Sequence, residues 1–188
     1  LLVSTICFAQ SKEERAAALK EKKARSLSDT QSPEGLNFKL GDDKQVTWQK
    51  IYEVAGKRNI SGLKHYVLHH SDIKAGDIAH IYFNDADQPF FTDANIFSLF
   101  CSAVAATIKD GVFGDINFVH LHDWHTSMLL FLREFDPEYV LLKSIRFVYS
   151  IHNLAIQGIR PFSNNYSSVD AFFPNVPYNH EVLMDRRY

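Results

Sequence analysis

Four side chains that could do chemistry lie within six residues near the middle of the chain: His120, His122, Asp123 and His125. Imidazole nitrogens and carboxylate oxygens bind metals, and the same groups transfer protons. An apolar run, residues 116–121, comes directly before this group. The pattern therefore indicates either a metal site or another kind of site that needs polar groups at the end of an apolar strand.

The zinc interpretation can be tested against the spacing. His-x-His-Asp-x-His resembles the His-x-His-x-Asp-His pattern of binuclear zinc hydrolases, but the aspartate comes one position early, which would turn its carboxylate elsewhere. Along a strand His120 and His122 share a face, whereas His125 falls in the first turn of the following helix. Only two further histidines, His152 and His180, follow. We expect no metal and no cofactor, and a zinc hydrolase stays an alternative that elemental analysis would test.

Structural roles compete with functional ones in the same stretch. Asp123 lies at a strand-to-helix junction, where capping the helix that begins at Trp124 and direct function are both open. We interpret His120 as a strand residue whose ring is satisfied by a neighbour. Trp124 is interpreted first as an anchor of its helix in the core.

A second polar group follows the apolar run 146–151 and consists of His152, Asn153 and Gln157. Gly158 ends the segment, and a glycine lets a loop approach a ligand closely. Residue chemistry alone leaves a binding site and a plain loop open. In an open parallel sheet, however, ligands bind beyond the carboxyl ends of the strands, and both polar groups lie at such ends.

The elements that must position these groups form one βαβ unit. Residues 116–121 and 144–153 are of strand character, and residues 124–135 between them have helical periodicity that Pro137 ends. Both strands are continuously apolar, which predicts a parallel sheet covered on both faces. The predicted fold class is α/β with a Rossmann-like parallel sheet flanked by helices. The residues at helical spacing are Trp124, Met128, Phe131, Leu132 and Phe135.

The rest of the chain supplies further elements. Residues 1–10 fit a buried first strand better than the tail of a signal peptide, and residues 28–35 have the composition of a loop. The other expected elements are an exposed charged helix at 11–27, a hairpin at 36–54, a strand at 62–70, a buried helix at 96–108 and a long C-terminal loop with one short helix.

Composition excludes several classes of function. The chain has 188 residues, 46% of them apolar, and 20 basic residues against 22 acidic ones, so neither nucleic acid nor an anionic membrane is an expected partner. No segment approaches the ~20 apolar residues of a membrane span. Cys7 and Cys101 are too few for a disulfide framework and fit two buried thiols in a reducing compartment, so we expect a cytoplasmic protein.

Two stretches in register carry a family resemblance. "FVHLHDWHTSMLLFLREF", residues 118–135, and "RFVYSIHNLAIQGIRPF", residues 146–162, resemble the bacterial glycogen synthases and plant starch synthases. That family typically has His-Asp-Trp-His at a strand end, and a His-Asn-Leu-Ala-Tyr-Gln-Gly run about one helix and one strand later. "DQPFFTDANIFSLFCSAVAATI", residues 87–108, is similar to the family's preceding stretch. The resemblance covers about residues 62–188.

The resemblance implies the GT-B arrangement, in which two Rossmann-like domains face each other across a cleft. Residues 1–188 would form the N-terminal, acceptor-side domain, with residues 1–35 uncertain and the C-terminal donor domain absent. The implied reaction transfers glucose from a nucleotide-glucose, usually ADP-glucose, to an α-1,4-glucan with retention and without a metal. The donor domain would hold most of the groups that neutralise the leaving diphosphate, so we expect the isolated chain to be inactive.

The resemblance also implies residue roles. His152 matches the family's histidine that meets the donor sugar, and Asp123 matches the aspartate at the cleft edge; these are the expected catalytic residues. Such a pocket agrees with chemistry, because sugars need dense hydrogen bonding from polar side chains. The expected substrate-binding residues are Asn153, Gln157, Trp124 and His125.

Two departures from the family pattern bear on function. The family's first strand leads into a Lys-x-Gly-Gly-Leu loop that contacts phosphate, but this chain has no glycine before Gly35, so we assign no phosphate-binding lysine. Ile156 stands where the family usually has tyrosine. A non-catalytic glucan-binding module derived from such an enzyme is therefore an alternative. The choice between ADP- and UDP-glucose and the oligomeric state stay open.

Overall fold

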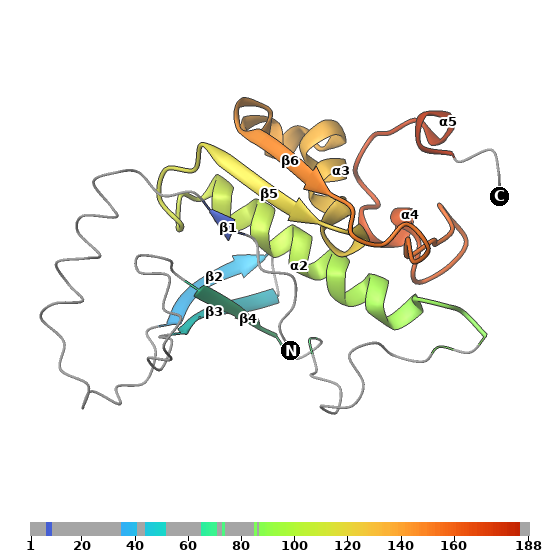
Figure 1. Cartoon of the computed structure of the whole chain (residues 1–188), viewed down its shortest axis with the longest axis horizontal. Helices are drawn as coiled ribbons and strands as arrows, with labels where there is room; N and C mark the ends of the chain where they lie inside the picture. Colours follow the sequence, from blue (N-terminus) through green and yellow to red (C-terminus); the bar gives the residue numbers. More distant parts are fainter. Residues whose placement is uncertain are drawn as a thin grey trace, which may run out of the picture.

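The strands form two three-stranded sheets that lie on either side of a long helix (Figure 1). The structure is a computed structural model and describes residues 7–8, 35–40, 44–51, 65–70, 73, 85 and 87–184. One sheet has the order β1–β5–β6 and the other the order β2–β3–β4. The long helix is α2 (Phe91–Lys109).

The first sheet contains the predicted βαβ unit. Strands β5 (Phe118–His122) and β6 (Arg146–Ser150) pair in parallel, and β1 (Cys7–Phe8) pairs antiparallel with β5. Between β5 and β6 the chain forms the 3-10 turn η1 (Trp124–Thr126), helix α3 (Ser127–Phe135) and the 3-10 segment η2 (Pro137–Ser144). The α/β, Rossmann-like class is confirmed.

Helix α3 ends where its sequence stops supporting a helix. Pro137 cannot supply a backbone N–H to continue the hydrogen-bonding pattern, and Asp136 accepts a hydrogen bond from the backbone N–H of Glu138 to begin η2. Arg133, in the last turn of α3, donates hydrogen bonds to the carbonyls of Leu142 and Lys143. These contacts fix η2 against α3 and so set the start of β6.

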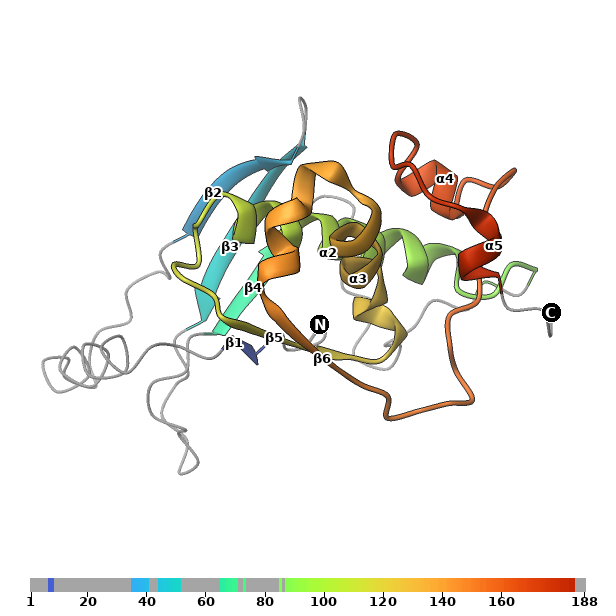
Figure 2. The ribbon, with the colours of Figure 1, turned by 90° about the horizontal axis from the view of Figure 1, so that it is seen from above.

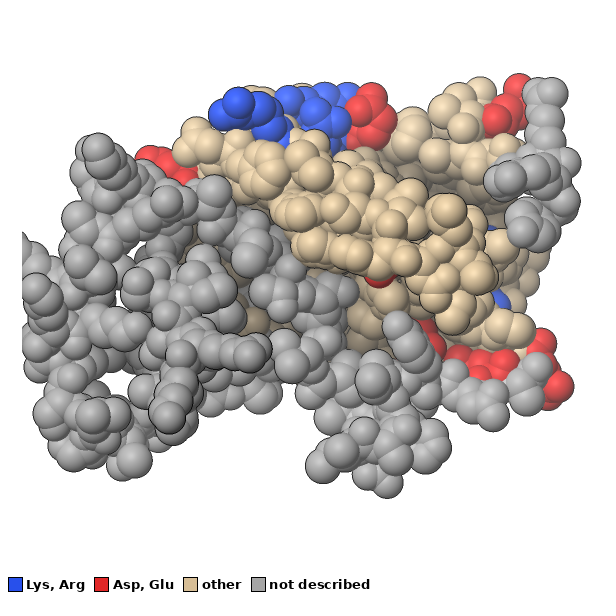
Figure 3. Space-filling view, in the orientation of Figure 1, with Lys and Arg blue, Asp and Glu red and all other residues tan. Residues whose placement is uncertain are grey.

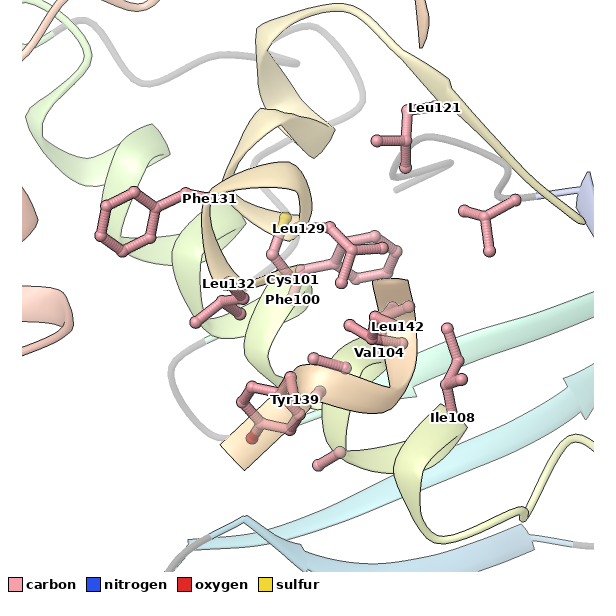
Figure 4. Packing of buried hydrophobic residues seen from close by; sticks show 14 of the residues in the cluster. Phe100, Cys101, Val104, Ile108, Leu121, Leu129, Phe131, Leu132, Tyr139 and Leu142 are labelled. Atoms are coloured by element: carbon pink, nitrogen blue, oxygen red, sulfur yellow. The ribbon is translucent and has the colours of Figure 1, made fainter. Parts of the chain in front are cut away.

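The core lies where α2, α3 and η2 meet the first sheet (Figure 4). The small residues Ala103, Ala105 and Ala106 of α2 are buried in it. Burying aliphatic side chains of this size contributes roughly 1.5–3 kcal/mol each relative to exposure. The largest side chains that are almost fully buried are Leu121, Leu129, Leu132, Leu142, Val104 and Val119.

Helix α2 confirms the predicted buried helix but begins earlier, at Phe91. Asp85 explains the earlier start, because its carboxylate accepts hydrogen bonds from the backbone N–H and the hydroxyl of Thr92, at 2.7 and 3.0 Å. By length and composition α2 could cross a membrane, but 72% of its apolar window is buried inside the protein. That degree of burial is typical of a core helix. Cys101 lies on α2 and is fully buried, and burial raises the pKa of its thiol to about 12.

The expectation that both faces of the sheet are covered is wrong for β6. Val148 is 42% exposed and Tyr149 is 37% exposed. β6 lies at the edge of its sheet, and β5 is its strand partner among the described residues. An apolar strand is stabilised when another element buries it, but its sequence does not specify which segment that element is.

The second sheet confirms the predicted hairpin and the strand after it. Strands β2 (Gly35–Leu40), β3 (Lys44–Ile51) and β4 (His65–His69) pair antiparallel in sequence order. The C-terminal segment has two short helices instead of the expected one, α4 (Val169–Phe172) and α5 (His180–Leu183). The helix predicted at 11–27 and most of the strand predicted at 1–10 lie outside the described residues.

Candidate functional site

The two polar groups meet where β5 and β6 end side by side. The parallel register places His122 opposite Ser150, and the backbone N–H of Asp123 donates to the carbonyl of Ser150 at 2.9 Å. From there the chain continues into the exposed loop 151–159, which Figure 2 shows leaving the sheet toward α4 and α5. The expectation that both groups lie at one edge of the sheet is confirmed.

Asp123 does not cap the following helix. Its backbone has φ 54° and ψ −178°, a left-handed φ that is uncommon outside glycine, and its side chain accepts no capping hydrogen bond. The buried hydroxyl of Thr126 closes this turn instead, because it accepts from the N–H of His122 and donates to the carbonyls of His122 and Asp123. Of the two roles left open for Asp123, the capping role is wrong.

The Asp123 carboxylate instead holds the second polar group. Its Oδ1 accepts a hydrogen bond from the backbone N–H of His152 at 2.6 Å and from that of Asn153 at 3.3 Å. Partial burial raises the pKa of Asp123, but these two N–H donors and the nearby His152 and His125 outweigh it, so the net shift is downward. Asp123 is therefore ionised at neutral pH and fixes the start of the loop 151–159.

Three imidazole rings line up beside this carboxylate. His120 Nε2 lies 2.8 Å from the Ser150 hydroxyl, so His120 has the satisfied position that we expected. Its ring centroid is 4.2 Å from that of His122, and His122 Nδ1 lies 2.9 Å from His152 Nε2 with the two rings nearly parallel. Partial burial lowers the pKa of His122, and the neighbouring His120 and His152 lower it further.

Trp124 forms the floor under the loop. Its ring packs edge-on against Phe90 and Phe97, both with centroids 5.3 Å away, and stacks on His125. Gly158 lies directly on the same ring: a Cβ at Gly158 would come within 2.1 Å of it. The indole N–H is buried, and no side or main chain in the described part of the protein accepts its hydrogen. Trp124 thus packs against the loop at Gly158 and supports it.

The ring of His125 packs elsewhere than the rings of His120 and His122. Its ring packs against Phe97 and Trp124, and burial lowers its pKa although Asp123 acts in the opposite direction. Among residues 87–184 and the shorter described ranges, no group of three or more His, Cys, Asp or Glu side chains is placed to hold a metal ion.

Asn153 and Gln157 are exposed, and their side chains brace their own loop. Asn153 Oδ1 accepts from the backbone N–H of Ala155 at 2.8 Å, and Gln157 Nε2 donates to the carbonyl of Leu154 at 2.6 Å. Each keeps polar atoms for a ligand, because a primary amide offers two donors and an acceptor with two lone pairs. The loop is thereby held in shape by its own side chains.

Arg160 has a role that was not predicted from the sequence: it joins the end of this loop to the start of α2. Its guanidinium donates to the carbonyls of Ser167 and Pro89 at 3.1 and 3.0 Å and to Asn165 Oδ1 at 2.9 Å, and it lies over the ring of Phe91. A planar group with five donors can hold three segments at once.

Among the described residues on the face shown in Figure 3, most of the lysine and arginine atoms gather along the upper edge, beside acidic residues, and much of the remaining described surface is neither acidic nor basic. Arg133 and Lys143 both pair with Glu134. The side chains that the structure describes at the strand ends are one carboxylate, imidazoles and amides. This set of donors and acceptors suits a neutral polyhydroxyl ligand better than a polyanion.

Sequence reasoning missed the direct contact between His122 and His152. The signal for it was present: strand alternation puts His120 and His122 on one face, and a parallel β6 brings residues 150–152 alongside. The register between β5 and β6 could not be predicted from the sequence. A shift of one residue would have turned the His122 side chain to the other face of the sheet, away from His152.

Comparison with known proteins gives a consistent result. Residues 4–185 match the family model described as the starch synthase catalytic domain. The glycogen synthase of Bacillus cereus (strain B4264) is 32% identical over 127 residues, which cover 67% of this chain and 24% of the relative. The glycogen synthase of Anoxybacillus flavithermus is 32% identical over 118 residues, or 62% of this chain and 22% of that protein. No solved structure matches. The chain thus spans about a quarter of the length of these curated relatives.

Proposed function

Because the chain belongs to the family of starch synthase catalytic domains, we propose that it forms the acceptor-side part of a glucosyltransferase that extends an α-1,4-glucan. One observation in particular supports this function. The Asp123 carboxylate holds the backbone of His152 at the paired ends of two parallel strands, next to an exposed polar loop. This is the edge of an open sheet at which ligands bind.

In the proposed reaction the donor is a nucleotide-glucose, ADP-glucose by preference, and the anomeric configuration is retained. His152 meets the donor sugar and helps to stabilise its oxocarbenium-like state. Asp123 holds His152 in place and presents negative charge at the reacting centre, where stabilisation of developing charge has its largest effect. Asn153 and Gln157 bind sugar hydroxyls, with Trp124 and His125 as the wall behind them. The reaction needs no metal, and its proposed compartment is the cytoplasm.

We further propose that residues 1–188 act as an N-terminal domain that needs a donor-side domain as the second wall of the cleft. Basic side chains and helix N-termini of that domain would neutralise the leaving diphosphate. The relatives are about four times as long as the matched segment, which leaves room for such a domain. We therefore expect negligible transfer by this chain alone.

The test compares the chain alone with the chain joined to the remaining length of Bacillus cereus glycogen synthase, by incorporation of labelled glucose from ADP-glucose into glycogen. We expect incorporation only in the joined protein, and at least a hundredfold loss with His152→Ala. Asp136→Ala, which removes a carboxylate directly before η2, serves as the matched control and should keep the activity. Elongation by the isolated chain would contradict the two-domain proposal, and an active His152→Ala would contradict the role of His152.

The absence of any glycine before Gly35 favours a second candidate, a glucan-binding module without transferase activity. Separate calorimetric titrations with maltooligosaccharides and with ADP-glucose distinguish the two functions. Binding of glucan without nucleotide-sugar, together with an inactive joined protein, supports the module. Glucosyl transfer by the joined protein supports the enzyme.

A further inference from the structure

His122 holds the side chain of the proposed catalytic histidine. His122 Nδ1 and His152 Nε2 are 2.9 Å apart, a hydrogen-bonding distance. A hydrogen bond between two imidazoles needs a hydrogen on one nitrogen and a lone pair on the other, so the protonation of one ring determines that of the other. The contact also commits one nitrogen of each ring.

His122 is the fixed member of this pair. Its backbone N–H and carbonyl are both hydrogen-bonded to the buried hydroxyl of Thr126, and its ring lies against His120, which the Ser150 hydroxyl holds in turn. His152, in contrast, is exposed and lies just beyond the end of β6. The orientation of the His152 ring is therefore set by the strand-bound partner.

We propose that His122 is a positioning residue for His152: it occupies Nε2 of His152 and leaves Nδ1 as the ring nitrogen that meets a ligand. Across the described residues, Nδ1 of His152 has no hydrogen-bond partner. The consequence for glucosyl transfer rests on the function proposed above, whereas the pairing of the two rings does not.

The same geometry makes the pair sensitive to acid. If both rings are protonated, two N–H groups face each other and the hydrogen bond is lost. The groups that face His122 are the rings of His120 and His152, the Asp123 carboxylate and the Thr126 hydroxyl. Among these groups only the carboxylate favours a positive charge on His122.

Long-range ¹H–¹⁵N NMR of the ligand-free chain tests this pairing, because ring nitrogen shifts report which nitrogen carries the hydrogen. We expect one tautomer of His152 in the native chain above about pH 7.5. His122→Phe, which keeps a ring but removes Nδ1, should shift His152 to the mixture found in a peptide of residues 146–158. His122→Asn, which restores a polar group near the position of Nδ1, should recover one tautomer.

His125→Phe is the matched control, because the same change three residues later leaves the His122–His152 contact intact. A tautomer mixture of His152 in the native chain would overturn the proposal whether or not the variants fold. An unchanged His152 tautomer in His122→Phe would overturn it as well. In the joined glucan-elongating protein we expect His122→Phe to lower kcat about tenfold to a hundredfold, with partial recovery in His122→Asn. If no joined protein transfers glucose, the proposed function fails, but the NMR result still decides the pairing.

Discussion

Asp123 combines a left-handed backbone with a carboxylate that two loop amides share. With φ 54° and ψ −178°, the backbone lies near a region that is essentially reserved for glycine, so Asp123 holds a strained turn at this position. The carboxylate then uses this turn to reach the N–H groups of His152 and Asn153. Backbone geometry and site chemistry therefore depend on the same residue.

Replacing Asp123 with alanine should free the start of the loop. Hydrogen bonds to a charged acceptor contribute about 1.5–3 kcal/mol when buried, and partial exposure here reduces the expected loss to about 1 kcal/mol. We expect faster amide hydrogen exchange at His152 and Asn153, measured by NMR. Asp136→Ala removes a comparable carboxylate-to-amide bond at the start of η2 and should leave those two amides protected. Unchanged exchange in Asp123→Ala would contradict the proposed holding role.

Stability should fall as the pH drops below about 6.5. Burial lowers the pKa of both His122 and His125 from the ordinary histidine value of 6.5, so between the folded and unfolded pKa values the unfolded chain binds more protons. The stabilisation is complete above the unfolded value and is lost as the pH falls through the folded values. Asp123 has a separate window, below its ordinary value of 3.8, because its pKa is also lowered.

Urea unfolding at about pH 7.5, 6.5 and 5.5 measures this dependence. We expect the midpoint to fall with each step, and the fall to be shallower in His125→Phe, which removes one titrating ring. A midpoint that rises on acidification across this range would show that the assigned sign is wrong.

At the scale of elements, the loop 151–159 is held at both ends by residues of one turn. Asp123 binds its start, and Trp124 lies beneath Gly158 near its end. Gly158 has φ 61°, and its missing side chain is what allows the backbone to lie on the indole ring. The segment between β5 and α3 therefore positions a loop that comes about 30 residues later.

Gly158→Ala should be more harmful than Gly111→Ala, although both glycines have positive φ. Gly111 has open space around its Cβ position, so alanine there carries only the left-handed cost of about 1–2 kcal/mol. At Gly158 the methyl group would overlap Trp124, which adds about 1–3 kcal/mol of overpacking. Urea midpoints measure the difference, and Trp124 emission should change in a background where the other tryptophan, Trp48, is phenylalanine.

A double-mutant cycle makes the cause specific. Combined with Trp124→Leu, which removes the overlapping ring atoms, Gly158→Ala should lose most of its extra cost. Equal effects of the two glycine substitutions, or an extra cost that persists without the indole, would contradict the contact between Gly158 and Trp124.

The sequence predicted most of these elements because their signals are local. Each signal can be recognised within about a dozen residues: the apolar periodicity of α3, the alternating apolar residues of β2 and β3, and the polar ends of β5 and β6. The capping role considered for Asp123 was equally local, and it failed because the loop amides of His152 and Asn153 are the competing donors. The Gly158 contact and the Arg160 clamp join distant residues, and a single sequence carries no pattern that pairs them.

At the scale of the whole molecule, Arg160 joins segments that are far apart in the chain. Gln88 accepts hydrogen bonds from Arg160 and Asn165, and Ser167 donates its hydroxyl hydrogen to the carbonyl of Phe91, 76 positions earlier. These contacts fasten the C-terminal segment beside the first turn of α2. They fix where the exposed loop can go after it leaves β6.

Arg160→Met should destabilise the chain by about 2 kcal/mol, because carbonyl and amide acceptors would lose a charged donor. Arg160→Lys should recover only part of the loss, since an ammonium cannot reproduce the planar fork. Arg146→Met, a change at an exposed arginine on β6, is the matched control and should lie within about 0.5 kcal/mol of the native chain. Denaturant unfolding measures all three, and a native-like Arg160→Met would refute the clamp.

The Arg160 contacts also set an order of events during synthesis. The carbonyl of Pro89 is made 71 positions before the guanidinium that binds it, and Gln88 is made 77 positions before Asn165. At roughly 5–20 residues per second, a ribosome needs about 4–15 s to add that much chain. Throughout this interval the residues of the first turn of α2 are already synthesised without the partners that later hold them, so in the nascent chain this end of the helix lacks the contacts that fasten it in the finished protein.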